Sequence, residues 1–171
     1  MKRSEQNTEG MQKVADLVED IGVGMLTWAD DSGTLTSRPM VPQEMDADGA
    51  LWFFARLSSH RLAAQGKVNL AFARPDQATY VSISGRADWV ENREKIESLW
   101  TDRAQPWFPA GPQDPDLSLL RVDVDDAEFW DVDSSQMVRM GMPRAAAMGG
   151  EPVGLGDTGK VANPKFPAAL V

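Results

Sequence analysis

Ser58-Ser59-His60-Arg61 is the stretch whose residue types are best suited to binding a ligand. It follows the β-type run Leu51–Arg56 and opens a short amphipathic segment that we expect to be helical. A serine at a helix start accepts a backbone N–H bond, and the other free N–H groups and the positive end of the helix dipole attract an anion. Arg61 adds a positive charge, as does His60 when it is protonated. The stretch therefore predicts a phosphate site.

Apolar side chains and a further cation accompany this stretch. Phe53, Phe54 and Ala55 come just before it, and Arg38 lies on the preceding β-type run, Thr34–Val41, from which it can point toward the same end. An anion site beside an aromatic and aliphatic wall suits an amphiphilic ligand such as a nucleotide or a flavin phosphate. An ordinary capped helix after a core strand, with its arginines as surface charges, explains the same residues equally well.

The composition excludes several other kinds of site and partner. The chain has 171 residues, no cysteine and one histidine, which excludes disulfides, thiolate catalysis and multi-histidine metal sites. A formal net charge of −9 makes nucleic acid and anionic membranes poor partners, because both bind cationic surfaces. No run approaches the roughly 18 apolar residues of a membrane span, and the N-terminus does not resemble a signal peptide. We expect a cytoplasmic protein with no metal and no identifiable general base.

Periodicity predicts a helix and then strands in the first part of the chain. Thr8–Asp20 has apolar residues at helical spacing, whereas Ile21–Trp28 and Thr34–Val41 read as strands. Pro39 cannot donate a ladder hydrogen bond, so it places its strand at an edge, a bulge or a gap. Gln43–Gly49 is expected to connect Thr34–Val41 to Leu51–Arg56 in a β-hairpin.

The second part of the chain predicts more strands and one helix. Glu91–Trp100 has a helical stripe with Asn92 as its N-cap. The 105–115 segment is a proline-rich loop that carries Trp107, and it is either a lid, a dimer contact or a hydrophobic plug. Residues 141–171 are rich in Gly, Pro and Ala and are expected to be a flexible tail. The strands are predicted over Val68–Arg74, Thr79–Val90, Leu117–Val124 and Glu128–Val132, the last two separated by Asp125-Asp126-Ala127.

Five blocks, in order, resemble the pyridoxamine 5′-phosphate oxidase-like split-barrel superfamily, and within it the bacterial general stress protein branch. They are Ser37–Met40, Leu51–Arg61, Val68–Phe72, Thr79–Arg86, and Trp107-Phe108-Pro109 with Gly111 and Asp114–Asp116. We therefore expect a mainly β protein, a six-stranded antiparallel split β-barrel with Greek-key connectivity and peripheral helices. The expected domain spans 11–140, between a flexible N-terminus, 1–10, and the tail.

The resemblance also implies a cofactor and a partner. It implies a homodimer with FMN at the interface, with FAD as a further candidate and a small-molecule electron donor as a further ligand. Ser59, His60 and Arg61 match a phosphate motif of the Ser-Arg-Lys type, although His60 replaces a residue that is often cationic. The residues that hold pyridoxal phosphate in the true oxidases are not recognisable, so vitamin synthesis is not predicted. The remaining cofactor-binding candidates are Arg38, Pro39, Met40, Phe53, Phe54, Ala55, Ser58 and Trp107.

Several functions are compatible with these residues. The chain is either an FMN-dependent oxidoreductase or a flavin reservoir without turnover, and the branch resemblance favours the reservoir. A deazaflavin-dependent reductase and a ligand-free dimeric scaffold are the alternatives, while the single His60 argues against haem ligation. Binding of FMN, FAD or riboflavin to the purified protein distinguishes the flavin functions from the scaffold.

Overall fold

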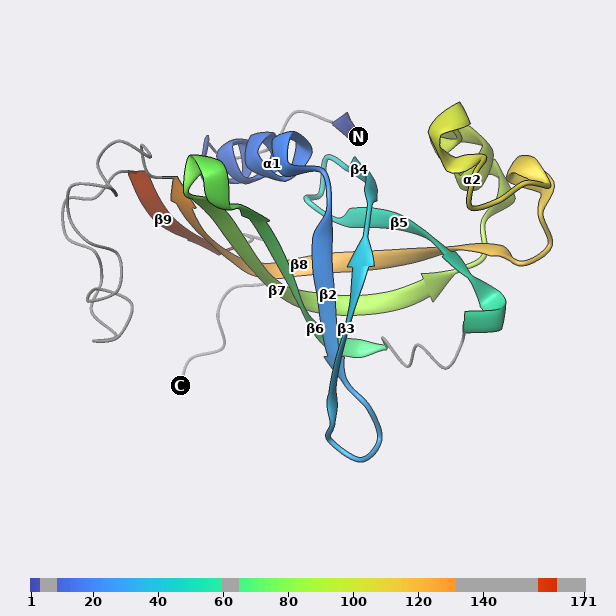
Figure 1. The fold of residues 1–171 in the computed structure, drawn as a ribbon, viewed down its shortest axis with the longest axis horizontal. Coiled ribbons are helices and arrows are strands. Elements are labelled where there is room, and N and C mark those ends of the chain that lie inside the picture. Colours follow the sequence, from blue (N-terminus) through green and yellow to red (C-terminus); the bar gives the residue numbers. More distant parts are fainter. Residues whose placement is uncertain (4–8, 60–64, 132–156, 163–171) are drawn as a thin grey trace.

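The computed structural model describes residues 1–3, 9–59, 65–131 and 157–162, and these residues form one curved sheet with helices packed on it (Figure 1). The strand order is β1-β4-β5-β8-β7-β6-β2-β3, and β9 pairs with β8. The strands are β1 (Lys2–Arg3), β2 (Gly24–Ala29), β3 (Leu35–Met40), β4 (Pro42–Met45), β5 (Leu51–Arg56), β6 (Gly66–Arg74), β7 (Thr79–Val90), β8 (Leu117–Asp131) and β9 (Asp157–Ala162). The helices are α1 (Glu9–Ile21), α2 (Arg93–Leu99) and the short 3₁₀ turns η1 (Leu57–Ser59), η2 (Pro75–Gln77), η3 (Asp102–Ala104) and η4 (Gly111–Gln113).

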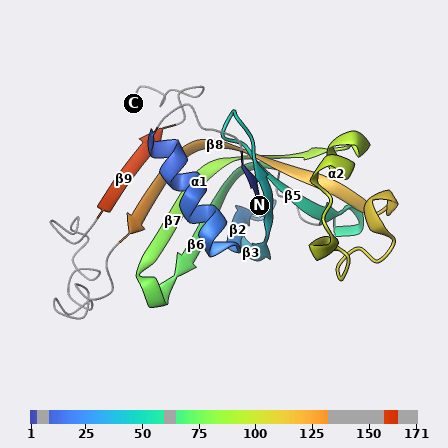
Figure 2. The same cartoon turned by 90° about the horizontal axis from the view of Figure 1, so that it is seen from above.

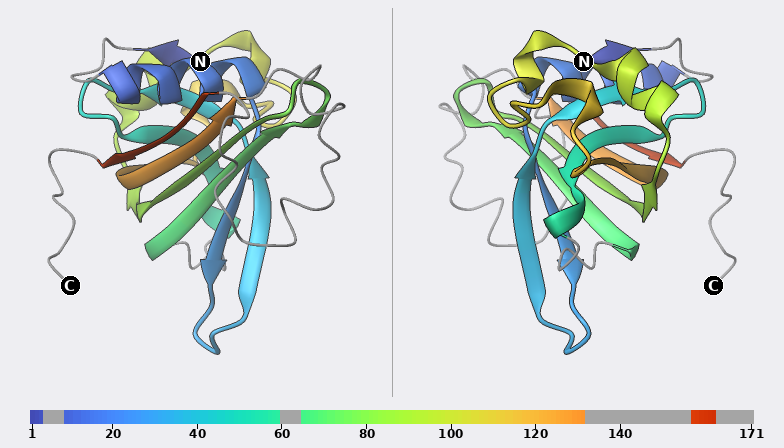
Figure 3. Two further views of the ribbon diagram at one scale, coloured as in Figure 1. Left: turned by 90° about the vertical axis from the view of Figure 1, so that its left-hand side faces the viewer. Right: turned by 90° about the vertical axis from the view of Figure 1, so that its right-hand side faces the viewer.

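The sheet is bent into a half-barrel by its connectivity. β3 and β4 are separated only by Val41, yet they lie near opposite ends of the strand order. The sheet must therefore curl until these two strands approach each other, as the side views show (Figure 3). All the pairings are antiparallel except that of β1 with β4.

A bulge in the longest strand pair allows part of this bend. The register of β7 and β8 shifts between Ser84 and Gly85, which leaves Asp125 without a partner of its own. A Cβ at Gly85 would lie 2.2 Å from the carbonyl oxygen of Asp123, so only glycine fits this close approach.

Two buried clusters hold the elements together. The larger one joins the concave side of the sheet to the apolar stripe of α1, which lies across one end of the sheet (Figure 2). The smaller one packs α2 and the 105–116 loop against β5 and β8 at the other end, through Ile96, Leu99, Phe108, Leu117 and Leu119. These clusters place α2 and the loop beside the end of β5, where the sequence predicts a site.

The sequence predicted the fold class correctly, but not the number of strands. The protein is a mainly antiparallel split β-barrel with helices, and β2–β8 give seven barrel strands instead of six. The extra strand, β4, begins at Pro42 and takes up part of the expected connector Gln43–Gly49. The predicted hairpin of Thr34–Val41 with Leu51–Arg56 is wrong, because β3 pairs with β2 and the hairpin partner of β5 is β4. The real turn is shorter, since the Asp46 Oδ1 accepts bonds of 3.0 Å from the N–H groups of both Asp48 and Ala50. The predicted break at Asp125-Asp126-Ala127 is also wrong, because β8 continues through it at the bulge.

The ends of the chain and one predicted helix are described only in part. Lys2 and Arg3 form β1 within the expected N-terminal segment, and β9 lies within the expected tail. Most of the predicted helix after β5 is outside the described residues. The residues that directly follow β5, Leu57–Ser59, form the 3₁₀ turn η1. The predicted N-cap of α2 is confirmed, because the Asn92 side chain accepts a bond of 2.9 Å from the Lys95 N–H. No described helix is long and apolar enough to cross a membrane.

Candidate functional site

A groove with a volume of about 780 Å³ opens between β3, the end of β5 and the loop that follows α2. It contains six of the predicted site residues, namely Arg38, Pro39, Met40, Phe54, Ala55 and Trp107. The other lining residues are Met1, Lys2, Val41, Pro42, Gln43, Arg56, Leu99, Thr101, Arg103, Ala104, Pro106 and Phe108. Segments far apart in the sequence thus form one site.

Positive charge dominates this groove. Lys2, Arg38, Arg56 and Arg103 line it, and no Asp or Glu is among its described lining residues, although the whole chain has a formal charge of −9. Within the described part of the chain, Arg38 and Arg103 make no ion pair. A local excess of cations in an acidic protein attracts an anionic ligand to that place.

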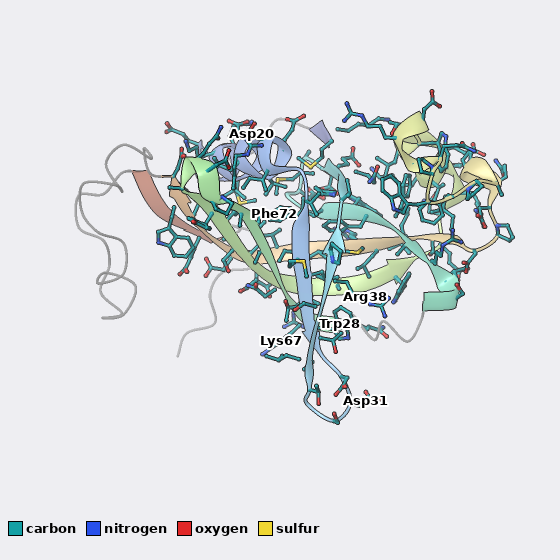
Figure 4. The ribbon with its side chains drawn as sticks, in the orientation of Figure 1. Asp20, Trp28, Asp31, Arg38, Lys67 and Phe72 are labelled. Atoms are coloured by element: carbon teal, nitrogen blue, oxygen red, sulfur yellow. The ribbon has the colours of Figure 1, made fainter. Side chains whose placement is uncertain are left out.

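The edge position of β3 exposes Arg38. Arg38 is opposite Leu26 on β2 and therefore lies on the face that carries the core, but β3 is the last strand of the sheet and leaves it exposed. Figure 4 shows the Arg38 side chain on the side of the β2–β3 hairpin that faces the end of β5. On the opposite face, the hydroxyls of Ser37 and Thr27 are 2.7 Å apart. Pro39, as predicted, is in an edge strand.

Aromatic side chains form the wall of the groove opposite β3. Phe54 contacts Phe108 with ring centroids 6.1 Å apart and Trp100 at 5.9 Å. The Trp107 side chain is 63% exposed, which is unusual for so large an apolar group. Phe53 points to the other face of β5 and is fully buried in the core, so its side chain is not part of this wall.

Ser58 is held by a carboxylate. Its N–H donates to Asp116 Oδ1 at 2.6 Å, and its hydroxyl donates to Oδ2 at 2.8 Å. These two bonds, together with the Arg56 guanidinium, lower the pKa of Asp116 from its ordinary value. The Ser59 side chain, His60 and Arg61 are outside the described residues, so the predicted phosphate motif stays a prediction.

Sequence reasoning missed the roles of two arginines of this region. Arg56 bonds Asp116, which lies 60 positions away, and no local pattern connects residues so distant. Arg103 lies on η3, between the predicted helix Glu91–Trp100 and the 105–115 loop, in a segment that showed no pattern. A count of cations on the segments flanking the predicted site would have found both arginines, but it would not have shown what each of them contacts.

The curled antiparallel sheet with its peripheral helices places the protein among the split-barrel proteins, and the groove beside β3 is lined by cations. A model of the pyridoxamine 5′-phosphate oxidase like family matches residues 9–153, so the chain belongs to that family. Comparison with curated proteins gives no match.

Solved structures agree with this assignment. A candidate general stress family protein from Xanthomonas campestris pv. campestris is 30% identical, with a TM-score of 0.63, over 74% of this chain and 89% of that chain. A general stress FMN/FAD binding protein from Xanthomonas citri is 27% identical, with a TM-score of 0.60, over 72% and 90%. A candidate general stress protein 26 from Jannaschia sp. CCS1 is 23% identical, covers 90% and 98%, and shows the same fold with a TM-score of 0.64.

Proposed function

We propose that this chain is an FMN-binding protein of the general stress type, which holds the flavin in the groove between β3, β5 and the 105–116 loop. The observation that carries the proposal is a groove lined by four cations, an aromatic wall and no described carboxylate. FMN is a flat apolar ring system with a phosphate, so it matches both halves of that surface. The Xanthomonas citri relative, an FMN/FAD binding protein, supports the same ligand class.

The chain's own residues divide between the two parts of the ligand. Arg38, with Ser59, His60 and Arg61 as the further candidates, would bind the phosphate, because a guanidinium forms strong charge-assisted hydrogen bonds to phosphate oxygens. Met40, Phe54 and Trp107 would form the wall for the ring system. When bound, the flavin supplies redox chemistry, and the protein needs only to bind and orient it.

A homodimer completes this proposal. Among the described residues, five large apolar side chains are markedly exposed, and four of them lie on or beside β2 and β3, namely Val23, Met25, Leu35 and Val41. Clustered exposed apolar groups are typical of protein interfaces. Because β3 also borders the groove, a second copy docked here would lie close to the flavin.

Titration with flavins tests the ligand. FMN fluorescence is expected to be quenched saturably by the purified protein, with FMN bound more tightly than riboflavin, which lacks the phosphate. FAD measures whether a longer anionic ligand fits the same groove. If none of the three flavins binds, the proposed function is wrong.

A second measurement separates an oxidoreductase from a reservoir. The FMN complex is mixed under anaerobic conditions with a reduced nicotinamide, and the visible absorbance of the flavin is followed. Bleaching on the timescale of turnover would indicate an FMN-dependent oxidoreductase, whereas a stable spectrum over the same time would favour storage. The resemblance to the general stress branch favours storage, so we expect the stable spectrum.

A further inference from the structure

Arg56 joins the end of β5 to both ends of the loop that forms the groove's aromatic wall. Its Nη1 donates to Asp116 Oδ2 at 3.1 Å, and its Nη2 donates to the backbone carbonyl of Trp107. Between these two contacts, the guanidinium carbon lies 5.0 Å from the centroid of the Phe108 ring. One side chain therefore fixes residues 107, 108 and 116 with respect to the strand.

Asp116 strengthens this connection from the other side. Its carboxylate accepts the two bonds from Ser58, and its backbone carbonyl accepts the Leu57 N–H at 2.7 Å. The end of β5 and the end of the loop are thus joined by three bonds besides those of Arg56. The Arg56–Asp116–Ser58 latch, as we name this group, is built from two segments that are distant in the sequence.

The latch separates Arg56 from the other cations of the groove. Its charge is paired with Asp116, whereas Arg38 and Arg103 have no ion pair within the described residues. An arginine that is already paired is poorly placed to neutralise an incoming phosphate. Arg56 instead bonds the backbone carbonyl of Trp107, whose N–H donates to the Ala104 carbonyl at 3.0 Å, and so ties the residue that carries the exposed indole to the end of β5.

We propose that Arg56 is a positioning residue of the flavin site, which holds the Trp107 indole at the groove and thereby sets the affinity for the flavin ring. This proposal rests on the proposed function. A positioning role differs from a phosphate-binding role, because it concerns the flavin ring and not the phosphate. Loss of Arg56 should therefore weaken the binding of FMN and of riboflavin by the same factor. Loss of a phosphate ligand should weaken FMN alone.

The test uses Arg56→Gln, which removes the ion pair and keeps a polar side chain, and Asp116→Asn, which removes the other partner if the first variant folds poorly. The matched control is Arg93→Gln. Arg93 supports the same loop from α2, through bonds to the carbonyls of Pro112 at 3.3 Å and Asp114 at 2.9 Å, but it does not contact Trp107. Melting temperatures report any general loss of stability.

We expect Arg56→Gln to weaken both FMN and riboflavin about tenfold, the size of one lost charge-assisted hydrogen bond. Arg93→Gln should leave both dissociation constants unchanged. The double variant Arg56→Gln, Trp107→Ala should bind FMN and riboflavin as well as Trp107→Ala does, because Arg56 acts on affinity through the Trp107 indole. A penalty that adds fully to that of Trp107→Ala, or a loss confined to FMN, would overturn the positioning role.

A measurement without ligand completes the test. In protein labelled with fluorotryptophan, the Trp107 fluorine resonance, identified by its loss in Trp107→Phe, should shift or broaden in Arg56→Gln and not in Arg93→Gln. An unchanged resonance in Arg56→Gln would contradict the latch. Absence of flavin binding by the wild-type protein would overturn the proposed function itself, whereas binding with an unperturbed Trp107 would overturn only the role of Arg56.

Discussion

At the scale of single residues, the groove contains arginines in two different environments. Arg38 is exposed at the edge of the sheet and has no described ion pair, whereas Arg56 is paired with Asp116. Both residues carry the same charge, so the difference comes entirely from their neighbours. FMN and riboflavin differ only in the phosphate. Loss of Arg38 should therefore weaken the binding of FMN alone, whereas loss of Arg56 should weaken the binding of both flavins.

We predict that Arg38→Ala weakens FMN binding at least tenfold and leaves riboflavin binding unchanged. A hydrogen bond to a charged group contributes about 1.5–3 kcal/mol, and a tenfold change in affinity corresponds to about 1.4 kcal/mol. Arg86→Ala is the control, because Arg86 is an exposed arginine of β7 outside the groove. Equal losses for FMN and riboflavin would show that Arg38 does not bind the phosphate.

The latch should depend on pH through Asp116. Bonds from the Ser58 N–H, the Ser58 hydroxyl and Arg56 lower the pKa of Asp116 in the folded protein. A carboxylate with a lowered folded pKa stabilises the fold above its unfolded pKa, which is about 3.9, and loses this contribution as the pH falls through the folded value. The contribution should therefore be constant near neutrality.

We therefore expect the melting temperature of Asp116→Asn to lie below that of the wild type by a constant amount between about pH 6 and pH 8. The difference should shrink below about pH 4, where the wild-type carboxylate is protonated too. Thermal unfolding of both proteins across this range is the measurement. A difference that persists undiminished in acid would mean that the charge of Asp116 is not what the latch uses.

At the scale of elements, local patterns predicted whatever depends on neighbours in the sequence. The stripe of α1 and the Asn92 cap of α2 were predicted because helix signals lie within one or two turns. The continuous β8 was not, because an Asp-Asp pair indicates a turn unless a bulge opposite Gly85 accommodates it. The groove was predicted in part, since Arg38 and Phe54 lie in recognisable blocks while the partner of Arg56 is far along the chain.

The bulge gives a prediction for the fold. Gly85→Ala would place a Cβ against the Asp123 carbonyl, which belongs to backbone and cannot rotate away. We expect it to lower the free energy of unfolding by about 2 kcal/mol or more, in the range of overpacked interiors. Denaturant unfolding measures this loss, with Ser84→Ala as the control because Ser84 is exposed. Equal stability of the two variants would mean that the bulge relaxes freely.

At the scale of the whole molecule, the sheet ends in an exposed apolar face. Met25 on β2 is directly opposite Pro39 on β3 and Ala71 on β6, and all three are exposed in one row across the three strands. Val23 and Val41, two positions along the chain from Met25 and Pro39, are about half exposed as well. A monomer would leave this face in water, so its burial against a second copy is the expected reason for it.

If the proposed dimer forms through this face, Met25→Glu should convert it into a monomer. In a two-fold symmetric interface each substitution occurs twice, so two buried carboxylates without partners would oppose association. Sedimentation or size exclusion with light scattering measures the mass, and Gln77→Glu, on the exposed turn η2, adds the same charge away from this face. A dimeric Met25→Glu would place the interface elsewhere.

If the variant is monomeric and folded, its FMN affinity then decides whether the groove is complete in one chain. An unchanged affinity contradicts a site shared between two copies. A loss of affinity that Gln77→Glu does not reproduce supports such a shared site.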